Sequence, residues 1–394
     1  MEKPKPDTVL VNAGRDPAAN HGVVNPPVYH ASTILFPTVE ALHAAQKTRD
    51  PLKSRYGRYG TPTTFALEQA VAALEGGHHS ICVGSGVSAI VVALMAYLKA
   101  GDHVLMVDSV YGPSRRFCDT VLARFGVTTT YYDPLIGAGI AKLIQPNTRV
   151  IFLESPGSLT FEVQDVPAIA AVARKAGITT IIDNTWATPL FFKPLAHGVD
   201  VSLHSATKYI GGHSDLMMGI LTANEAAYPA LRRAADDLGP ASGPDDCYLA
   251  LRGLRTLSVR LQRHQETGLI LARWLQQRPE VACVLHPGLP GDPGHALWKR
   301  DFTGASGLFS IELKPVPEKA VAAMLDGLEL YGMGASWGGF ESLALPSEVA
   351  KLRTATPWVN RGPVIRIHAG LEDPSDLIAD LEAGFARLRQ AAGA

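Results

Sequence analysis

Short apolar runs alternate with amphipathic runs through the middle of the chain. The apolar runs predict strands at 80–83, 103–107, 128–132, 150–153, 179–182 and 200–204. Between them lie runs with helical spacing, at 65–74, 87–99, 113–125 and 167–176. Strands and helices in turn predict an α/β fold, with a mainly parallel sheet flanked by helices.

The alternation of strands and helices does not continue into the N-terminal or the C-terminal part of the chain. Residues 1–60 are rich in proline, glycine and polar side chains, with one helical candidate at 39–47, so we expect an arm that folds against its own body or a partner subunit. Residues 61–255 form the α/β domain. Residues 256–394 open with a long helix, at about 255–277, and form a smaller α+β domain. Its expected strands and helices lie at 307–313, 364–368, 318–328 and 375–389.

Composition narrows the class of protein. The 394 residues carry a formal net charge of −1 and no basic run, which argues against a nucleic-acid-binding surface. No apolar segment is long enough to span a bilayer, so we expect a cytoplasmic protein without a membrane partner. The four cysteines are widely spaced and lack a C-x-x-C pattern, so we expect reduced thiols and no metal site: Cys82, Cys118, Cys247 and Cys283.

Residues suited to chemistry follow several of the predicted strands. In a doubly wound sheet, ligands bind beyond the carboxyl ends of the strands. The residues at such ends are Gly84–Gly86, Tyr111, Glu154–Ser155, Asp183 and Ser205–Lys208. This coincidence indicates one ligand site more strongly than any single motif does.

Lys208 and Asp183 suit one cofactor, pyridoxal phosphate. That cofactor needs an amine for its Schiff base, an acid that keeps its pyridine nitrogen protonated, and donors for its phosphate. Ser205 and Thr207 add hydroxyl donors beside the lysine. The alternatives are an exposed lysine after a strand and an aspartate that caps a turn.

The turn Gly84-Ser85-Gly86 joins a strand to a helix. Free backbone N–H groups and the positive end of a helix dipole make such a turn an anion site. The third glycine of a dinucleotide fingerprint is missing, and a simple tight turn is an equal alternative.

Two further residues suit an amino-acid substrate. Tyr111 follows a strand, where its ring could stack on the cofactor, and a phenol whose pKa nearby cations lower could also move protons. Arg366 interrupts the apolar strand at 364–368, and its planar fork matches a substrate carboxylate. The alternatives are a turn residue for Tyr111 and an internal salt bridge for Arg366.

The segment Ser205 to Asp215, which reads SATKYIGGHSD, resembles the lysine segment of the Cys/Met-metabolism (transsulfuration) family of pyridoxal-phosphate enzymes. The resemblance covers nearly the whole chain. It includes YGRYGTPT at 56–63, GSG at 84–86, DNT at 183–185, GGFES at 338–342 and VIRI at 364–367. Within the family, Ser336-Trp337 and Tyr56-Gly57-Arg58 are most similar to bacterial cystathionine β-lyases. Val87 is a departure, because many relatives carry methionine there.

The resemblance implies fold type I, the pyridoxal-phosphate transferase fold, and a homotetramer built from two dimers. It implies that Lys208 and Tyr111 are catalytic and that Asp183 and Tyr111 contact the cofactor ring. The implied phosphate ligands are Gly86, Val87, Ser205 and Thr207, with Tyr56 and Arg58 of the neighbouring subunit. The implied substrate contacts are Arg366, Ser336, Trp337 and Tyr56.

The expected reaction is cleavage of L-cystathionine to L-homocysteine, pyruvate and ammonia, in methionine biosynthesis. Other reactions on the same scaffold remain open: cystathionine γ-lyase or γ-synthase, methionine γ-lyase, a sulfhydrylase, or a lyase of cystine and cysteine S-conjugates. An alternative of another class is a non-catalytic α/β protein that binds a phosphate ligand at Gly84–Gly86.

Overall fold

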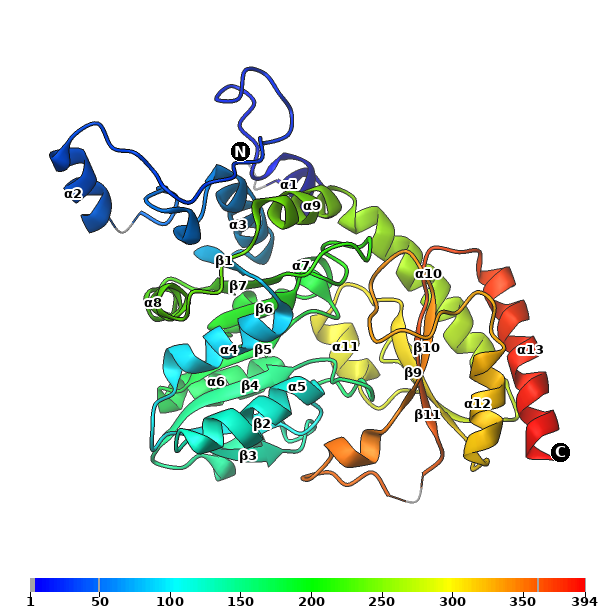
Figure 1. Cartoon of the computed structure of the whole chain (residues 1–394). Helices are drawn as coiled ribbons and strands as arrows, with labels where there is room; N and C mark the ends of the chain where they lie inside the picture. The colour runs from blue at the N-terminus through cyan, green and yellow to red at the C-terminus, as the bar shows by residue number, and fades with distance from the viewer. Residues whose placement is uncertain (1–3, 49, 360, 394) are drawn as a thin grey trace.

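Two sheets organise the computed structural model, which describes residues 4–48, 50–359 and 361–393 (Figure 1). The larger sheet has seven strands in the order β1-β7-β6-β5-β4-β2-β3. In chain order these are β1 (His79–Val83), β2 (His103–Val107), β3 (Thr128–Tyr132), β4 (Thr148–Glu154), β5 (Thr179–Asp183), β6 (Val201–Ser205) and β7 (Gly219–Ala223). Every predicted strand of the α/β region is present, within two residues at each end.

The strand directions confirm a mainly parallel sheet. Strands β2 to β6 pair in parallel, whereas β7 pairs antiparallel with both β1 and β6. We did not expect β7. It lies between β6 and β1, so the chain turns back on itself directly after the Lys208 segment.

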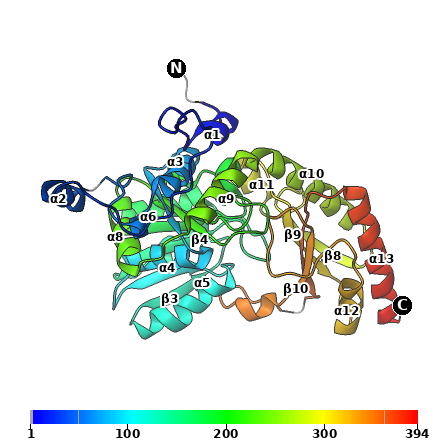
Figure 2. The same cartoon turned by 45° about the horizontal axis from the view of Figure 1, so that its top comes forward.

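Helices cover both faces of this sheet (Figures 1 and 2). Helix α3 (Pro62–Glu75) begins after Thr61 with a capping box and ends at Gly76, whose φ is +71°. The helix expected at 113–125 is instead a short α-helix continued by a π-helix at Phe117–Leu122. The α-helices are α3 (Pro62–Glu75), α4 (Gly86–Tyr97), α5 (Gly112–Arg116), α6 (Val166–Ala176), α7 (Thr188–Phe191), α8 (Tyr228–Leu238) and α9 (Pro244–Arg255).

A long helix, α10 (Leu257–Leu275), leads to the smaller sheet (Figure 1). That sheet is antiparallel, in the order β10-β11-β9-β8. Its strands are β8 (Val281–Leu285), β9 (Leu308–Leu313), β10 (Leu343–Ser347) and β11 (Val364–His368), of which β8 and β10 were not predicted. The remaining helices are α11 (His295–Asp301), α12 (Glu318–Asp326) and α13 (Pro374–Ala392).

Strand β11 has two unlike faces. Ile365 and Ile367 are buried in the hydrophobic core of the C-terminal region. Because side chains alternate along a strand, Arg366 and His368 lie on the opposite face, which is turned toward the larger sheet. This alternation brings a charged group of one sheet to the edge of the other.

Few side chains of residues 4–60 are buried within the described part of the chain. Leu10 of α1 (Pro6–Asn12) is buried against α3 and α9, but α2 (Val39–Lys47) projects away from the body (Figure 2). Several apolar side chains of the arm are exposed, including Leu35 at 88% and Val39 at 68%. The expected boundaries fall just before α3 and between α9 and α10, and the domain division itself stays a prediction.

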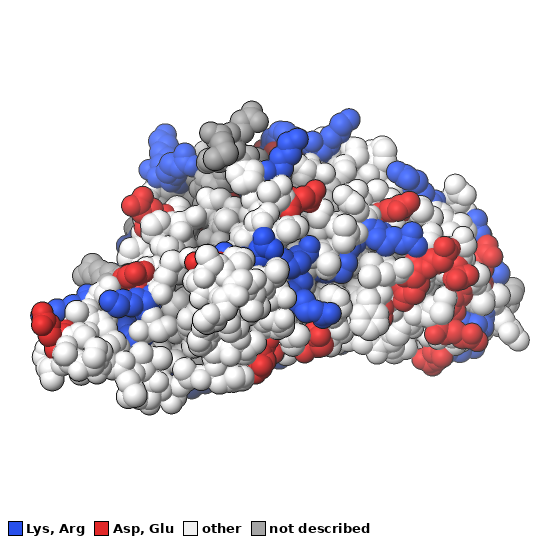
Figure 3. Space-filling model, turned by 90° about the horizontal axis from the view of Figure 1, so that it is seen from above, with Lys and Arg blue, Asp and Glu red and all other residues white. Residues whose placement is uncertain are grey.

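Cationic and anionic side chains share the surface drawn in Figure 3, in keeping with the net charge of −1. Over the ranges that the structure describes, no helix is both long enough and apolar enough to cross a membrane.

Candidate active site

A cavity of about 330 Å³ lies where the larger sheet meets β11. Strands β4, β5 and β6 are neighbours and run in the same direction, so their carboxyl ends open at one edge. The larger domain contributes most of the lining, and the loop Ala335–Trp337 and Arg366 close the other side. Predicted residues that line the cavity are Gly86, Val87, Tyr111, Asp183, Ser205, Thr207, Lys208, Ser336, Trp337 and Arg366.

Lys208 lies in the turn that follows β6. Its Nζ donates to Ser336 Oγ at 2.7 Å and lies 5.4 Å from the centroid of the Trp337 ring. Burial lowers the pKa of this amine from 10.5 to about 8, and the positive charge of Arg366 adds to the effect. A neutral amine, which is the nucleophilic form, is therefore accessible near neutral pH.

Asp183 ends β5 beside the lysine. Its Oδ1 accepts hydrogen bonds from the backbone N–H of Thr185, at 2.9 Å, and from the Thr185 hydroxyl, at 2.5 Å. Burial raises the pKa of the carboxyl, which the two hydrogen bonds oppose. Within the described part of the chain, the hydrogen bonds to this carboxylate all go to Oδ1, which leaves Oδ2 as an acceptor for a ligand N–H.

The start of α4 forms a cradle for an anion. Ser85 caps the helix through a bond from Ser88 N to its Oγ, and the first backbone N–H groups of an α-helix have no partner within the helix. A Cβ on Gly86 would lie only 2.7 Å from Ser205 Oγ, so glycine is required for this close approach. The Thr207 hydroxyl accepts from the backbone N–H of Met218 at 3.0 Å and donates to the Met218 carbonyl oxygen at 3.2 Å, and Thr207 lines the cavity.

Arg366 closes the cavity from the smaller sheet. Its Nη2 donates to the carbonyl oxygen of Ser336 at 2.9 Å. Burial lowers the pKa of the guanidinium, and no carboxylate of the described residues opposes this shift. The internal salt bridge that was the alternative for Arg366 is therefore not present in the described part of the chain.

Glu154 is a cavity residue to which sequence reasoning assigned no role. It ends β4, and the register sets it opposite Asp183 of β5. Its Oε2 accepts the backbone N–H of Tyr111 at 2.8 Å. Burial and the neighbouring Asp183 raise the pKa of Glu154 well above its usual range, which favours its neutral form. Its position at a strand end was the available signal.

The expectation for Tyr111 needs a correction. We expected nearby cations to lower the pKa of the phenol, but burial raises it, and Asp183 and Glu154 add to that effect. The positive charges of Arg366 and Arg116 oppose the shift without reversing it. The phenol therefore keeps its proton at neutral pH.

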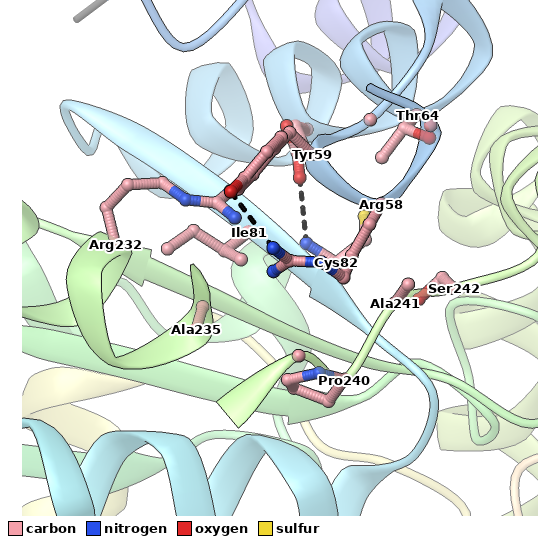
Figure 4. A pocket seen from close by; sticks show the side chains of 14 residues that line it. Arg58, Tyr59, Thr64, Ile81, Cys82, Arg232, Ala235, Pro240, Ala241 and Ser242 are labelled. Carbon is pink, nitrogen blue, oxygen red and sulfur yellow. Dashed lines mark hydrogen bonds between the residues drawn. The ribbon is translucent and has the colours of Figure 1, made fainter. Parts of the chain in front are cut away.

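Tyr56 and Arg58 lie outside the lining of the Lys208 cavity in the same chain. Arg58 lines a separate hollow between the arm and α8, where its Nη2 donates to Tyr59 Oη at 2.9 Å (Figure 4). Tyr56 borders another surface hollow, next to α2, and is 45% exposed. Their predicted contribution to the phosphate site of a neighbouring subunit stays a prediction.

The chain matches the family model described as Cys/Met metabolism PLP-dependent enzyme over residues 7–386. The chain belongs to this family. Cystathionine β-lyase MetC of Escherichia coli is 48% identical, and the match covers 98% of this chain and all of the relative. The cystathionine β-lyase of Salmonella typhimurium is 47% identical over 97% of this chain and 98% of the relative.

The fold agrees with the family. A solved structure of cystathionine γ-synthase from Xanthomonas oryzae pv. oryzae superposes with a TM-score of 0.90 at 33% identity, over 99% of this chain and all of that one. This confirms the predicted fold type and the dependence on pyridoxal phosphate. The alternative hypothesis, a non-catalytic phosphate-binding protein, is therefore wrong: the chain belongs to a family of enzymes that act on small amino-acid substrates.

The cavity fits the cofactor of the family. Lys208 would supply the amine, Asp183 Oδ2 would accept from the pyridine N–H, and the start of α4 would supply N–H groups for the phosphate. The glycine at position 86 leaves room beside Ser205 that any side chain would fill.

Proposed function

We propose that this protein is a carbon–sulfur β-lyase that converts L-cystathionine and water to L-homocysteine, pyruvate and ammonia. The observation that carries the proposal is the Lys208 amine, 2.7 Å from Ser336 Oγ, in a cavity that the Arg366 guanidinium also lines. A substrate held by its carboxylate at Arg366 would present its α-carbon to that amine. The names of the Escherichia coli and Salmonella relatives support this substrate.

Pyridoxal phosphate, when bound, supplies the electron sink that makes the α-proton of the substrate acidic. Lys208 would hold the cofactor, and Asp183 would keep the proton on its pyridine nitrogen. Tyr111 would lie against the ring. The phosphate would be held by the N–H groups of Gly86 and Val87 and by the hydroxyls of Ser205 and Thr207.

Three side chains of the cavity would bind the substrate and transfer protons: Arg366, Lys208 and Tyr111. Arg366 binds the α-carboxylate with its planar fork. The neutral Lys208 amine removes the α-proton. The bond between Cβ and sulfur then breaks, and the sulfur takes a proton from Lys208 or from Tyr111 Oη. The raised pKa of Tyr111 supports the role of proton donor, because the phenol arrives protonated.

The product assay tests this function directly. The enzyme, reconstituted with pyridoxal phosphate, is incubated with L-cystathionine, and the keto acid and the thiol are identified by mass spectrometry. Pyruvate with homocysteine supports β-elimination. Formation of 2-oxobutyrate would instead assign the enzyme to the γ-lyase reaction, and racemised substrate without a keto acid would mean that Lys208 returns the proton before the bond to sulfur breaks.

We further propose a cytoplasmic homotetramer in which each active site receives Tyr56 and Arg58 from a neighbouring subunit. The exposed apolar side chains of the arm support this arrangement, since Leu35 and Val39 lack cover within the chain. Arg58 lines a separate hollow rather than the Lys208 cavity of its own chain, which also supports the arrangement.

Mixed oligomers test the exchange of arms. Arg58→Ala and Lys208→Ala subunits, each inactive alone, are unfolded together and refolded. If arms are exchanged, a fraction of the mixed sites carries neither defect, and activity returns to about a quarter of the wild-type value or less. If Arg58 serves its own site, every site in the mixture keeps one defect, and no activity returns.

A further inference from the structure

Two side chains of β11 hold the two ends of one loop. Arg366 Nη2 donates to the carbonyl oxygen of Ser336 at 2.9 Å. The backbone N–H of Gly338 donates to Nε2 of His368 at 3.0 Å. Arg366 and His368 are two positions apart on the same face of the strand, so the loop Ser336–Gly338 lies along that face.

The hydrogen bonds define the tautomer of His368. Because Gly338 N–H is a donor, Nε2 must carry a lone pair, and the ring proton lies on Nδ1. Nδ1 is 3.1 Å from the carbonyl oxygen of Glu341, to which it donates. The imidazole is 1% exposed, and burial lowers its pKa well below the usual range, an effect to which His264 adds. Only the neutral ring satisfies both partners.

Gly338 lies directly against the lysine segment. Its φ is +86°, and a Cβ at this position would lie 2.8 Å from Tyr209 N and 2.9 Å from the Lys208 carbonyl carbon. The loop is therefore a wedge between β11 and the backbone that carries the catalytic amine. The side chains on the wedge are Ser336, whose Oγ accepts from Lys208 Nζ, and Trp337, whose ring borders the cavity.

We propose that His368 is a positioning residue of this active site. By accepting the Gly338 N–H it fixes the loop that holds Ser336 against the Lys208 amine and Trp337 over the cavity. Arg366 is then free to offer its remaining donors to a substrate carboxylate, because His368 shares the work of holding the loop. The inference rests on the proposed function only in the choice of substrate for the kinetic assay.

Two substitutions of similar shape isolate the acceptor. His368→Gln keeps an oxygen that can accept the Gly338 N–H, whereas His368→Met fills a similar volume without a strong acceptor. His264→Met is the matched control, because His264 is equally buried in the same aromatic cluster but bonds the Ala369 carbonyl instead of the loop.

The first measurement is hydrogen–deuterium exchange with residue-resolved fragmentation, on the holoenzyme. In the wild type we expect the Gly338 amide to be protected. We expect His368→Met to speed its exchange about 10- to 100-fold, and His368→Gln to stay within about fivefold of the wild type. An unprotected Gly338 amide in the wild type would overturn the inference even if neither variant folds.

The second measurement is the separation of kcat from KM with L-cystathionine. We expect His368→Met to lower kcat about 10- to 100-fold, with a smaller change in KM, because Arg366 is intact. Equal losses in His264→Met and His368→Met would mean that only packing matters, and the positioning role would be wrong. A wild type that forms no keto acid would refute the proposed function, while the exchange result would still decide the role of His368.

Discussion

The two sheets contribute polar groups to the cavity in different ways. Strands β5 and β6 are buried along their length and offer functional groups only at or beyond their carboxyl ends, where Asp183 and Lys208 lie. Strand β11 offers Arg366 to the cavity from within the strand, and His368, the last residue of the strand, lies on the same face and contacts the loop Ser336–Gly338. A parallel sheet covered on both faces has room for a ligand only at its ends, whereas an antiparallel sheet can present one whole face to another domain.

The two sheets therefore have different roles at the site: the larger sheet supplies a reacting group, and the smaller sheet supplies groups that hold other residues in position. In the proposed mechanism the larger sheet contributes the Lys208 amine, which exchanges protons because burial lowers its pKa. The groups of the smaller sheet hold other atoms in position, through Arg366 to Ser336 and through His368 to Gly338. Substitutions on the two sides should therefore fail in different ways.

The largest effect is expected on the side of the larger sheet. Lys208→Ala removes the cofactor anchor and the base together, and turnover of L-cystathionine should fall at least about 10³-fold. Pyruvate release measures the loss, and Lys175→Ala, on the exposed end of α6, is the control. Near-normal elimination by Lys208→Ala would refute the assignment of the catalytic amine.

The pH dependence of Lys208 comes next. Because its pKa is about 8 rather than 10.5, the neutral fraction at pH 7 should exceed that of an ordinary lysine about 300-fold. Labelling of the cofactor-free protein by an acylating reagent should rise with pH and reach half its maximum near pH 8. Arg366→Leu should move this midpoint upward, since the Arg366 charge lowers the pKa. A midpoint near 10 in the wild type would contradict the prediction.

On the side of the smaller sheet, Arg366→Leu should weaken substrate use without releasing the cofactor. We expect kcat/KM for L-cystathionine to fall about 100-fold, because a substrate carboxylate loses its charged partner. The visible absorbance of the bound cofactor should stay. Arg361→Leu is the matched control, because that guanidinium pairs with Glu312 just before the same strand. Loss of cofactor absorbance in Arg366→Leu would show that Arg366 also helps to hold the cofactor, and the proposed difference between the two sheets would be wrong.

The smallest effect is expected for Glu154→Gln. Since burial raises the pKa of Glu154 and so favours its neutral form, a neutral amide that still accepts the Tyr111 N–H should leave kcat/KM within about threefold of the wild type. Glu154→Ala should lose more, because the Tyr111 backbone is then unpaired. A loss of 100-fold in Glu154→Gln would show instead that the site requires an ionised carboxylate here.

Much of the larger domain could be predicted from local patterns. The segments at 103–107, 128–132 and 364–368 are strands with the expected bounds, because runs of five residues rich in β-branched, aliphatic and aromatic side chains between turn signals have few alternatives. Strand β7 could not be predicted. Its place between β6 and β1 depends on contacts with segments far away in the chain.

The same division applies to the site. Lys208, Asp183 and the turn before α4 could be identified because each follows a strand in the sequence. The role of Glu154, the raised pKa of Tyr111 and the bond from Gly338 to His368 could not, because each depends on a neighbour brought close by folding. The pKa and the hydrogen bonds of a side chain depend on its neighbours in the folded protein as well as on its residue type.

The sequence by itself determined the α/β class and the cofactor and predicted Lys208 as the lysine that would hold it, because these depend on residue types at the ends of local elements. Only the tertiary structure decided which face of β11 meets the lysine segment. It also decided that the loop Ser336–Gly338 lies between them, since packing two sheets against each other is a long-range event.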